Sequence, residues 1–166
     1  MAIQFQSLGS SFKLSDKAKI SKFIQLLAYL ELREIGDINY IFCTDDYLLK
    51  LNQQYLKHDT LTDIITFDYS VKDSSSKYQV ARQNPKEKRK PVESPELTAD
   101  IFISVERVGE NALSFKQPLN RELMRVMIHG VLHLCGYKDK FPADKKKMRA
   151  KEDYYLKLLE HTPNPS

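Results

Sequence analysis

The chain has 166 residues, of which 42% are hydrophobic and 29% charged, and its formal net charge of +4 at pH 7 is only weak support for a nucleic-acid partner. Its longest apolar runs fall well short of the roughly 20 residues that a membrane-spanning helix needs, so no membrane association is expected. Two cysteines, Cys43 and Cys135, are too few for a disulfide framework, and the first residues lack the pattern of a signal peptide. The low number of cysteines and the lack of a signal-peptide pattern favour the cytoplasm as the location of the protein.

The first part of the chain predicts two strands and two helices. A short strand is expected at 3–5, followed by an amphipathic helix that Ser15 caps and Gly36 terminates. A second strand is expected at 38–43. Thr44 then caps a short helix whose apolar side chains recur at helical spacing.

The middle of the chain predicts two more strands separated by a segment of different composition. The β-rich stretches at 64–69 and 100–104 predict the strands, and Ser104 is expected to cap a helix over 105–115. Between the strands, residues 72–96 are polar, rich in proline and basic. An insertion loop of this length is either a solvated surface segment or a basic arm that contacts phosphates.

Two further helices complete the chain, at about 120–135 and 143–159, before a tail at 162–166 that is expected to fray. No internal repeat or second domain is apparent, so we expect residues 1–166 to form a single domain. The order of elements favours the α+β class, with a small four-stranded mixed sheet covered by about five helices.

The helix at 120–135 carries a pattern typical of a metal site. His129 and His133 lie four residues apart, so they share a helical face with Cβ atoms roughly 5–6 Å apart. Gly136 allows the chain to reverse, which brings Asp139 back toward the same point. Two imidazoles and a carboxylate suit one zinc ion with a fourth position for water, although nickel, cobalt or iron(II) accept the same ligands. Such an ion would turn its water into a nucleophile at neutral pH.

A helical wheel separates a broad apolar back from a narrow polar front. The front is formed by Glu122, Arg125, His129, Gly130 and His133. Cys135 falls on the back and is left out of the ligand set. Gly130 occupies the position at which the zinc-peptidase motif His-Glu-x-x-His has its general base, which argues against peptide hydrolysis by that mechanism. We expect Gly130 to leave open space for a substrate beside the metal.

These residues resemble a known family. The stretch 129–137, His-Gly-Val-Leu-His-Leu-Cys-Gly-Tyr, is similar to the His-Gly-x-Leu-His-Leu-x-Gly-Tyr motif of the YbeY family of bacterial endoribonucleases and rRNA maturation factors. Residues 62–67, Thr-Asp-Ile-Ile-Thr-Phe, resemble its Thr-Asp-Val-Leu-Ser-Phe segment, and 100–104 resemble its Gly-Asp-Ile-x-Ile-Ser strand. The resemblance runs in order over about 38–160 and implies a metal helix like that of the zincins.

Two positions depart from the family pattern. The family usually continues Gly-Tyr-Asp-His and uses that histidine as its third metal ligand, whereas Asp139 stands there in this chain. Aspartate oxygen can replace imidazole nitrogen on zinc, but its negative charge makes the ion a weaker Lewis acid. The family also often places an arginine where this chain has Leu56, so Lys57, His58 or Arg125 would contact phosphate instead.

The resemblance implies metal-dependent cleavage of single-stranded RNA, in 16S rRNA 3′-end maturation and ribosome quality control, with rRNA and the small subunit or its proteins as partners. It implies His129, His133 and Arg125 as catalytic residues and His129, His133 and Asp139 as metal ligands. The basic residues expected to bind RNA are Lys57, His58, Lys86, Lys88, Arg89, Lys90, Lys138 and Lys140. Bases would stack on aromatic side chains such as Phe67, Tyr69 or Tyr137. Two alternatives stay open: a zinc metallopeptidase, and a non-catalytic ribosome-assembly factor with a structural metal.

Overall fold

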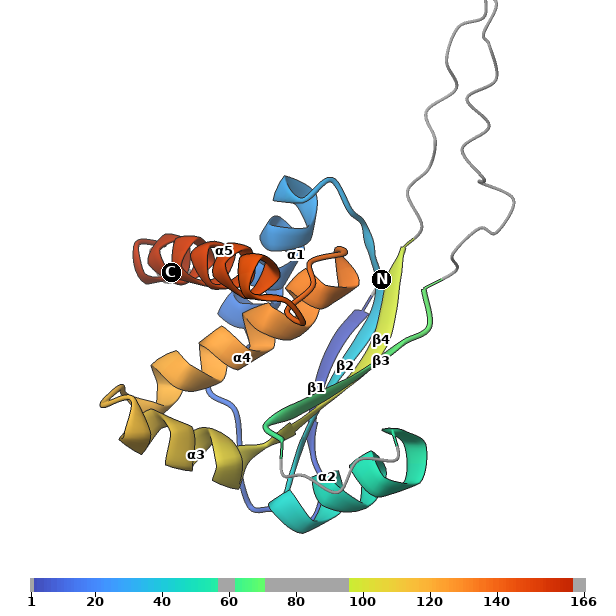
Figure 1. The fold of residues 1–166 in the computed structure, drawn as a ribbon. Coiled ribbons are helices and arrows are strands. Elements are labelled where there is room, and N and C mark those ends of the chain that lie inside the picture. The colour runs from blue at the N-terminus through green and yellow to red at the C-terminus, as the bar shows by residue number, and fades with distance from the viewer. Residues whose placement is uncertain (1, 57–61, 71–95, 163–166) are drawn as a thin grey trace, which may run out of the picture.

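The computed structural model describes residues 2–56, 62–70 and 96–162, and these residues build one four-stranded sheet (Figure 1). Its strands are β1 (Ala2–Ser7), β2 (Ile35–Cys43), β3 (Ile64–Asp68) and β4 (Leu97–Ser104), in the spatial order β1-β2-β4-β3. β1, β2 and β4 run parallel, and β3 pairs antiparallel with β4 at the edge. The predicted mixed four-stranded sheet is thus confirmed.

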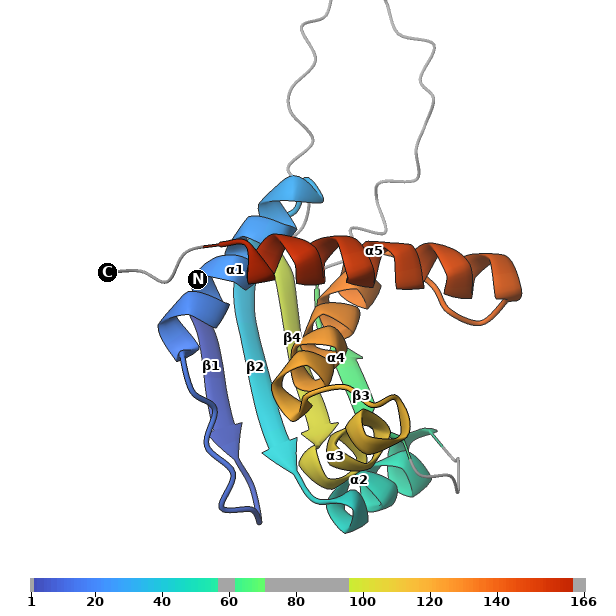
Figure 2. The same ribbon diagram turned by 90° about the vertical axis from the view of Figure 1, so that its left-hand side faces the viewer.

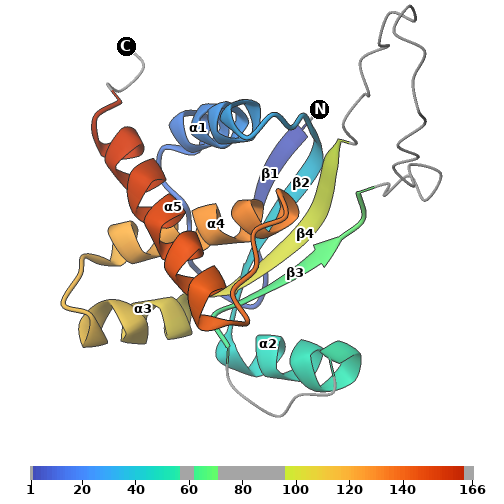
Figure 3. The ribbon, with the colours of Figure 1, turned by 45° about the horizontal axis from the view of Figure 1, so that its top comes forward.

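Helices cover the two faces of the sheet unequally (Figure 3). The face that carries more helices is covered by α1 (Lys17–Leu30), α3 (Val105–Ser114), α4 (Leu119–Leu134) and α5 (Pro142–Glu160). On the other side, α2 (Asp45–Leu51) continues into a π-helical turn, η1 (Asn52–Leu56). With five α-helices among the described residues, the predicted α+β architecture is confirmed.

The main core lies between the sheet and α4, with α1 and α5 packed around it. Ile38, Ile101 and Ile103 of the sheet are fully buried against this layer. The buried Tyr40 hydroxyl donates to the Met127 carbonyl oxygen at 3.1 Å, which ties β2 to the middle of α4. α5 crosses over α4 on its outer side (Figure 2). None of the helices in the described ranges has both the length and the apolarity to cross a bilayer.

Local sequence signals predicted some helix ends correctly and others wrongly. The Thr44 hydroxyl oxygen accepts from the Tyr47 N–H at 3.2 Å, and that of Ser104 accepts from the Arg107 N–H at 3.1 Å, so both predicted caps are confirmed. Ser15 is not the cap of α1, because Asp16 holds that position, without a side-chain hydrogen bond. Gly36 does not follow the helix as a terminator but lies inside β2, where Thr98 approaches too closely for a Cβ atom.

Candidate metal centre

Helix α4, which carries both histidines, lies directly on the sheet, and Gly130 makes this close approach possible. A Cβ atom at Gly130 would stand 3.0 Å from Ile64 Cδ1 and 3.3 Å from Ile101 Cγ2. The expectation of open substrate space beside Gly130 is therefore wrong, because this position faces the apolar surface of β3 and β4. Glu122, also expected on the polar front, is buried as well, at 2% exposure.

The end of α4 is built to return the chain toward the histidines. Gly136 has a φ of 104°, a conformation that a residue without Cβ adopts at little cost. Its N–H donates to the His133 carbonyl oxygen at 3.0 Å, and the Tyr137 N–H donates to that of Leu132 at 3.1 Å. This pair of bonds is the Schellman arrangement that closes many helices. The reversal expected at Gly136 is confirmed, and it places Asp139 over the helix face.

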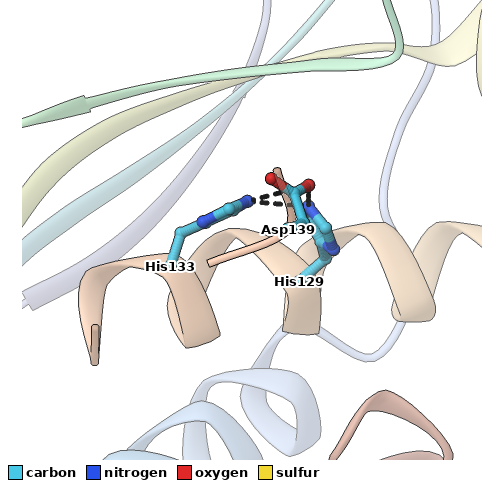
Figure 4. Close-up of side chains that lie close together, drawn as sticks. All are labelled: His129, His133 and Asp139. Carbon is cyan, nitrogen blue, oxygen red and sulfur yellow. Dashed lines mark hydrogen bonds and ion pairs between the residues drawn. The ribbon is translucent and has the colours of Figure 1, made fainter. Parts of the chain in front are cut away.

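Three potential ligand atoms converge at this face (Figure 4). His129 Nε2 and His133 Nε2 are 2.9 Å apart. Asp139 Oδ2 lies 3.3 Å from each of them. In a tetrahedral zinc site with ligands roughly 2.0–2.2 Å from the ion, neighbouring ligand atoms are about 3.3 Å apart. The two distances to Asp139 Oδ2 match this value, and the distance between the two nitrogens is somewhat shorter, so the three atoms lie near the spacing of ligands around one ion.

The partners of the two imidazoles determine which nitrogen faces the cluster. His129 Nδ1 donates to the Glu152 carboxylate at 3.0 Å, and His133 Nδ1 donates to the Tyr137 carbonyl oxygen at 2.9 Å. Both partners only accept hydrogen bonds, so in the neutral imidazole each Nδ1 carries the proton and each Nε2 presents a lone pair. Two lone pairs and a carboxylate oxygen directed at one point repel one another unless a cation lies between them. The donor set thus fits a divalent metal ion.

A buried charge cluster supports His129 from behind. Arg125 donates to Glu122 and, at 2.7 Å, to Glu152, whose second oxygen holds His129. Burial acts to raise the pKa of Glu152, but hydrogen bonds from His129 and Arg125 outweigh it and hold this pKa below its usual range. Burial likewise disfavours the charged Arg125, yet the two glutamates keep the pKa of Arg125 above its usual value. The cluster fixes the His129 ring and keeps net negative charge near the ligand atoms.

Glu152 is the site residue to which sequence reasoning assigned no role. It lies 23 residues from His129, on a helix that looks solvated and lysine-rich. The residue pattern of α5 could have predicted that Glu152 is buried, because Glu152 occupies the same apolar stripe as Met148, Tyr155 and Leu159. A glutamate in the buried stripe of an amphipathic helix needs a charged partner, which Arg125 supplies.

The structure places the other predicted site residues in three settings. Arg125 belongs to the buried cluster, so its guanidinium is engaged by carboxylates. Lys138 and Lys140 are exposed on either side of Asp139, and Leu56 is 47% exposed at the end of η1. Six predicted RNA-binding residues lie outside the described ranges, namely Lys57, His58, Lys86, Lys88, Arg89 and Lys90. Nearly all of the insertion predicted at 72–96 lies outside them as well.

Two further titratable groups lie close to the centre. Burial raises the pKa of Asp63, just before β3, while the nearby positive charge of Arg125 acts in the opposite direction. Burial also raises the pKa of the Cys135 thiol to about 12. Among the described residues, the convergent ligand atoms belong to His129, His133 and Asp139 and not to Cys135, which agrees with the omission of Cys135 from the ligand set.

Comparison with known proteins gives one consistent result. A family model described as "Endoribonuclease YbeY" matches residues 4–160. The Endoribonuclease YbeY of Flavobacterium psychrophilum is 48% identical over 148 residues, covering 89% of this chain and 90% of that protein. That of Flavobacterium johnsoniae is 43% identical over 150 residues, covering 90% and 92%. The solution structure of TM1509 from Thermotoga maritima is similar with a TM-score of 0.59 and 24% identity, over 95% of this chain and 89% of that one, which supports the fold alone.

Proposed function

This chain belongs to the YbeY family, and from that membership and the geometry of the metal centre we propose that it is a metal-dependent endoribonuclease specific for single-stranded RNA. Its proposed task is 16S rRNA 3′-end maturation and ribosome quality control on the small subunit, in the cytoplasm. The observation that carries the proposal is the convergence of His129, His133 and Asp139, with both imidazole tautomers set by their Nδ1 partners.

Each residue of the centre has a distinct part in this proposal. His129, His133 and Asp139 hold one divalent ion, for which zinc fits the donor set well. Such an ion, when bound, supplies an activated water and stabilises negative charge on a phosphoryl oxygen. Arg125, expected from the sequence to act in catalysis, is better placed to hold Glu152 and through it His129. Lys138 and Lys140 are exposed on both sides of Asp139, where their amino groups can approach the RNA backbone.

A basic surface continues from the metal loop, residues 135–141 between α4 and α5, onto α5 and suits an RNA strand. Residues 138–151 contain seven lysine and arginine residues against two aspartates. Those of α5 that are exposed are Lys145, Lys146, Lys147 and Arg149. Phosphate contacts of this kind bind RNA without demanding a sequence. We therefore propose that one side of the cleavage site follows the first half of α5.

The alternatives are less well supported. A peptidase would need a base beside His129, but position 130 faces Ile64 and Ile101, where a glutamate side chain has no room. A purely structural ion is usually enclosed by four protein ligands. In this centre three ligands converge, and the side chains of His133 and Asp139 are 31% and 45% exposed. The open side leaves access for a substrate.

A cleavage assay with metal removal tests the proposed function. We expect the purified protein to cut an unstructured RNA, to spare a fully paired RNA duplex and an unstructured peptide, and to lose RNA cleavage after treatment with a chelator. Adding back zinc or another divalent transition metal restores cleavage. A protein that carries metal but leaves all three substrates intact would instead support the assembly-factor alternative, and peptide cleavage would support the peptidase.

A second prediction concerns the unusual third ligand. We expect Asp139→His to retain the metal with equal or higher affinity and to cleave RNA at least as fast. The reason is that the ion is a stronger Lewis acid with a neutral imidazole as its third ligand than with a negatively charged carboxylate. Isothermal titration with zinc and initial cleavage rates measure both effects. The matched control is Asp144→His at the start of α5, which should change neither. Loss of metal in Asp139→His alone would remove Asp139 from the ligand set.

A further inference from the structure

A mostly buried carboxylate joins three separate parts of the molecule beside the metal loop. Glu31, at the end of α1, has a side chain that is only 10% exposed. It accepts from the Tyr137 hydroxyl at 2.8 Å, from the Lys151 ammonium at 3.0 Å and from the Tyr155 hydroxyl. Burial acts to raise the pKa of Glu31, but these three hydrogen bonds outweigh it and hold that pKa below its usual range. The carboxylate is therefore charged and fully engaged at neutral pH.

Other contacts also support the metal loop on the side of Glu31. The ammonium groups of Lys147 and Lys151 lie 5.6 Å and 5.5 Å from the centroid of the Tyr137 ring, and Tyr137 packs partly against the main core. A hollow of about 310 Å³ borders the loop, lined by Glu31, Gly136, Tyr137, Lys138, Asp144 and Lys147. Side chains that border a hollow lose packing contacts on that side. The hydrogen bonds to Glu31 therefore act together with this limited packing to set the position of the loop.

Tyr137 links this network to the ligands through three different groups. Its N–H closes the turn after α4, and its carbonyl oxygen accepts from His133 Nδ1. Its hydroxyl donates to Glu31, and only Lys138 separates it from Asp139. A shift of Tyr137 would therefore disturb the orientation of His133 and the reach of Asp139 together.

We propose that Glu31 is a positioning residue for the metal centre, which holds Tyr137 so that His133 keeps its orientation and Asp139 its place. The inference rests on the proposed metal site but not on the identity of the substrate. It assigns a role to a residue 106 positions away from Tyr137 in the sequence, on a helix that contributes no ligand.

Cobalt binding to the full-length chain tests the proposal, because the visible absorption of Co²⁺ reports ligand geometry directly. Glu31→Gln keeps the size of the side chain, but its amide cannot accept from two hydroxyls and an ammonium at once. We expect Co²⁺ affinity to fall about ten-fold, as for partners that orient ligands, with a changed visible spectrum. Tyr137→Phe should act alike, and the double variant should be no worse than either single one, since both break the same bond.

Two control variants separate positioning from stability. Glu34→Gln removes an equal charge from an exposed side chain and should change nothing. Tyr155→Phe weakens the link between α1 and α5 but keeps the bond from Glu31 to Tyr137, so it should lower the Tm and leave the Co²⁺ spectrum as in the wild type.

The proposal is overturned if Glu31→Gln and Tyr155→Phe lower the Tm alike while both bind Co²⁺ as the wild type does. If the wild type binds no Co²⁺, the metal centre itself fails and the role of Glu31 with it. Co²⁺ binding without RNA cleavage by the wild type would refute the proposed endoribonuclease alone, and the spectra of the variants would still decide the role of Glu31.

Discussion

Replacing His129 and His133 together by alanine is expected to abolish both metal binding and RNA cleavage. Each imidazole supplies one of three convergent ligand atoms, so the variant keeps only the Asp139 carboxylate. Loss of a residue that merely orients a ligand already weakens metal binding about 10–100-fold, and loss of two ligands should cost far more. Elemental analysis of the purified protein and an RNA cleavage time course measure the two effects.

A control for this double variant is available within the chain. His161→Ala removes an exposed imidazole at the end of α5, far from the ligands in the sequence, and should leave metal content and cleavage unchanged. Circular dichroism verifies that the double variant is folded. If the folded double variant still carries stoichiometric metal, the ion is bound elsewhere and the centre on α4 is not its site.

The features of this centre that the sequence predicts are those encoded by short spacings. The interval of four residues between His129 and His133 suffices to place them on one face of α4. Gly136 with its positive φ turns the chain, so the position of Asp139 follows from its distance to that glycine. The caps at Thr44 and Ser104 are likewise local, because each side chain bonds a backbone N–H three residues later.

The features that could not be predicted depend on contacts between distant segments. Glu152 and Glu31 reach the site only through the packing of α5 and α1, over sequence separations that no local pattern encodes. Gly130 gave a misleading signal for the same reason. A helical wheel places it near the histidines, but the distance of α4 from Ile64 and Ile101 decides that it faces the sheet. The wheel specifies directions around a helix and not what lies in each direction.

Replacing Glu152 by glutamine should weaken both the fold and the metal site. The carboxylate is 2% exposed and receives hydrogen bonds from Arg125 and His129, so its loss leaves the Arg125 charge opposed by Glu122 alone. Removing one partner of a buried ion pair costs about 3–5 kcal/mol. We expect the free energy of unfolding to fall by about 3 kcal/mol, because the amide can still accept one hydrogen bond. Urea unfolding of the metal-free protein measures this change.

The effect of Glu152→Gln on metal affinity must be separated from its effect on stability, and Glu122 provides the comparison. Glu122 is equally buried and pairs with the same arginine. Among the bonds of the described residues, however, it is Glu152 that holds His129 Nδ1. Glu122→Gln should therefore destabilise the fold and leave zinc affinity nearly unchanged, whereas Glu152→Gln should also weaken zinc binding about 10–100-fold. Equal zinc affinities in the two variants would mean that Glu152 stabilises α5 against α4 without orienting the ligand.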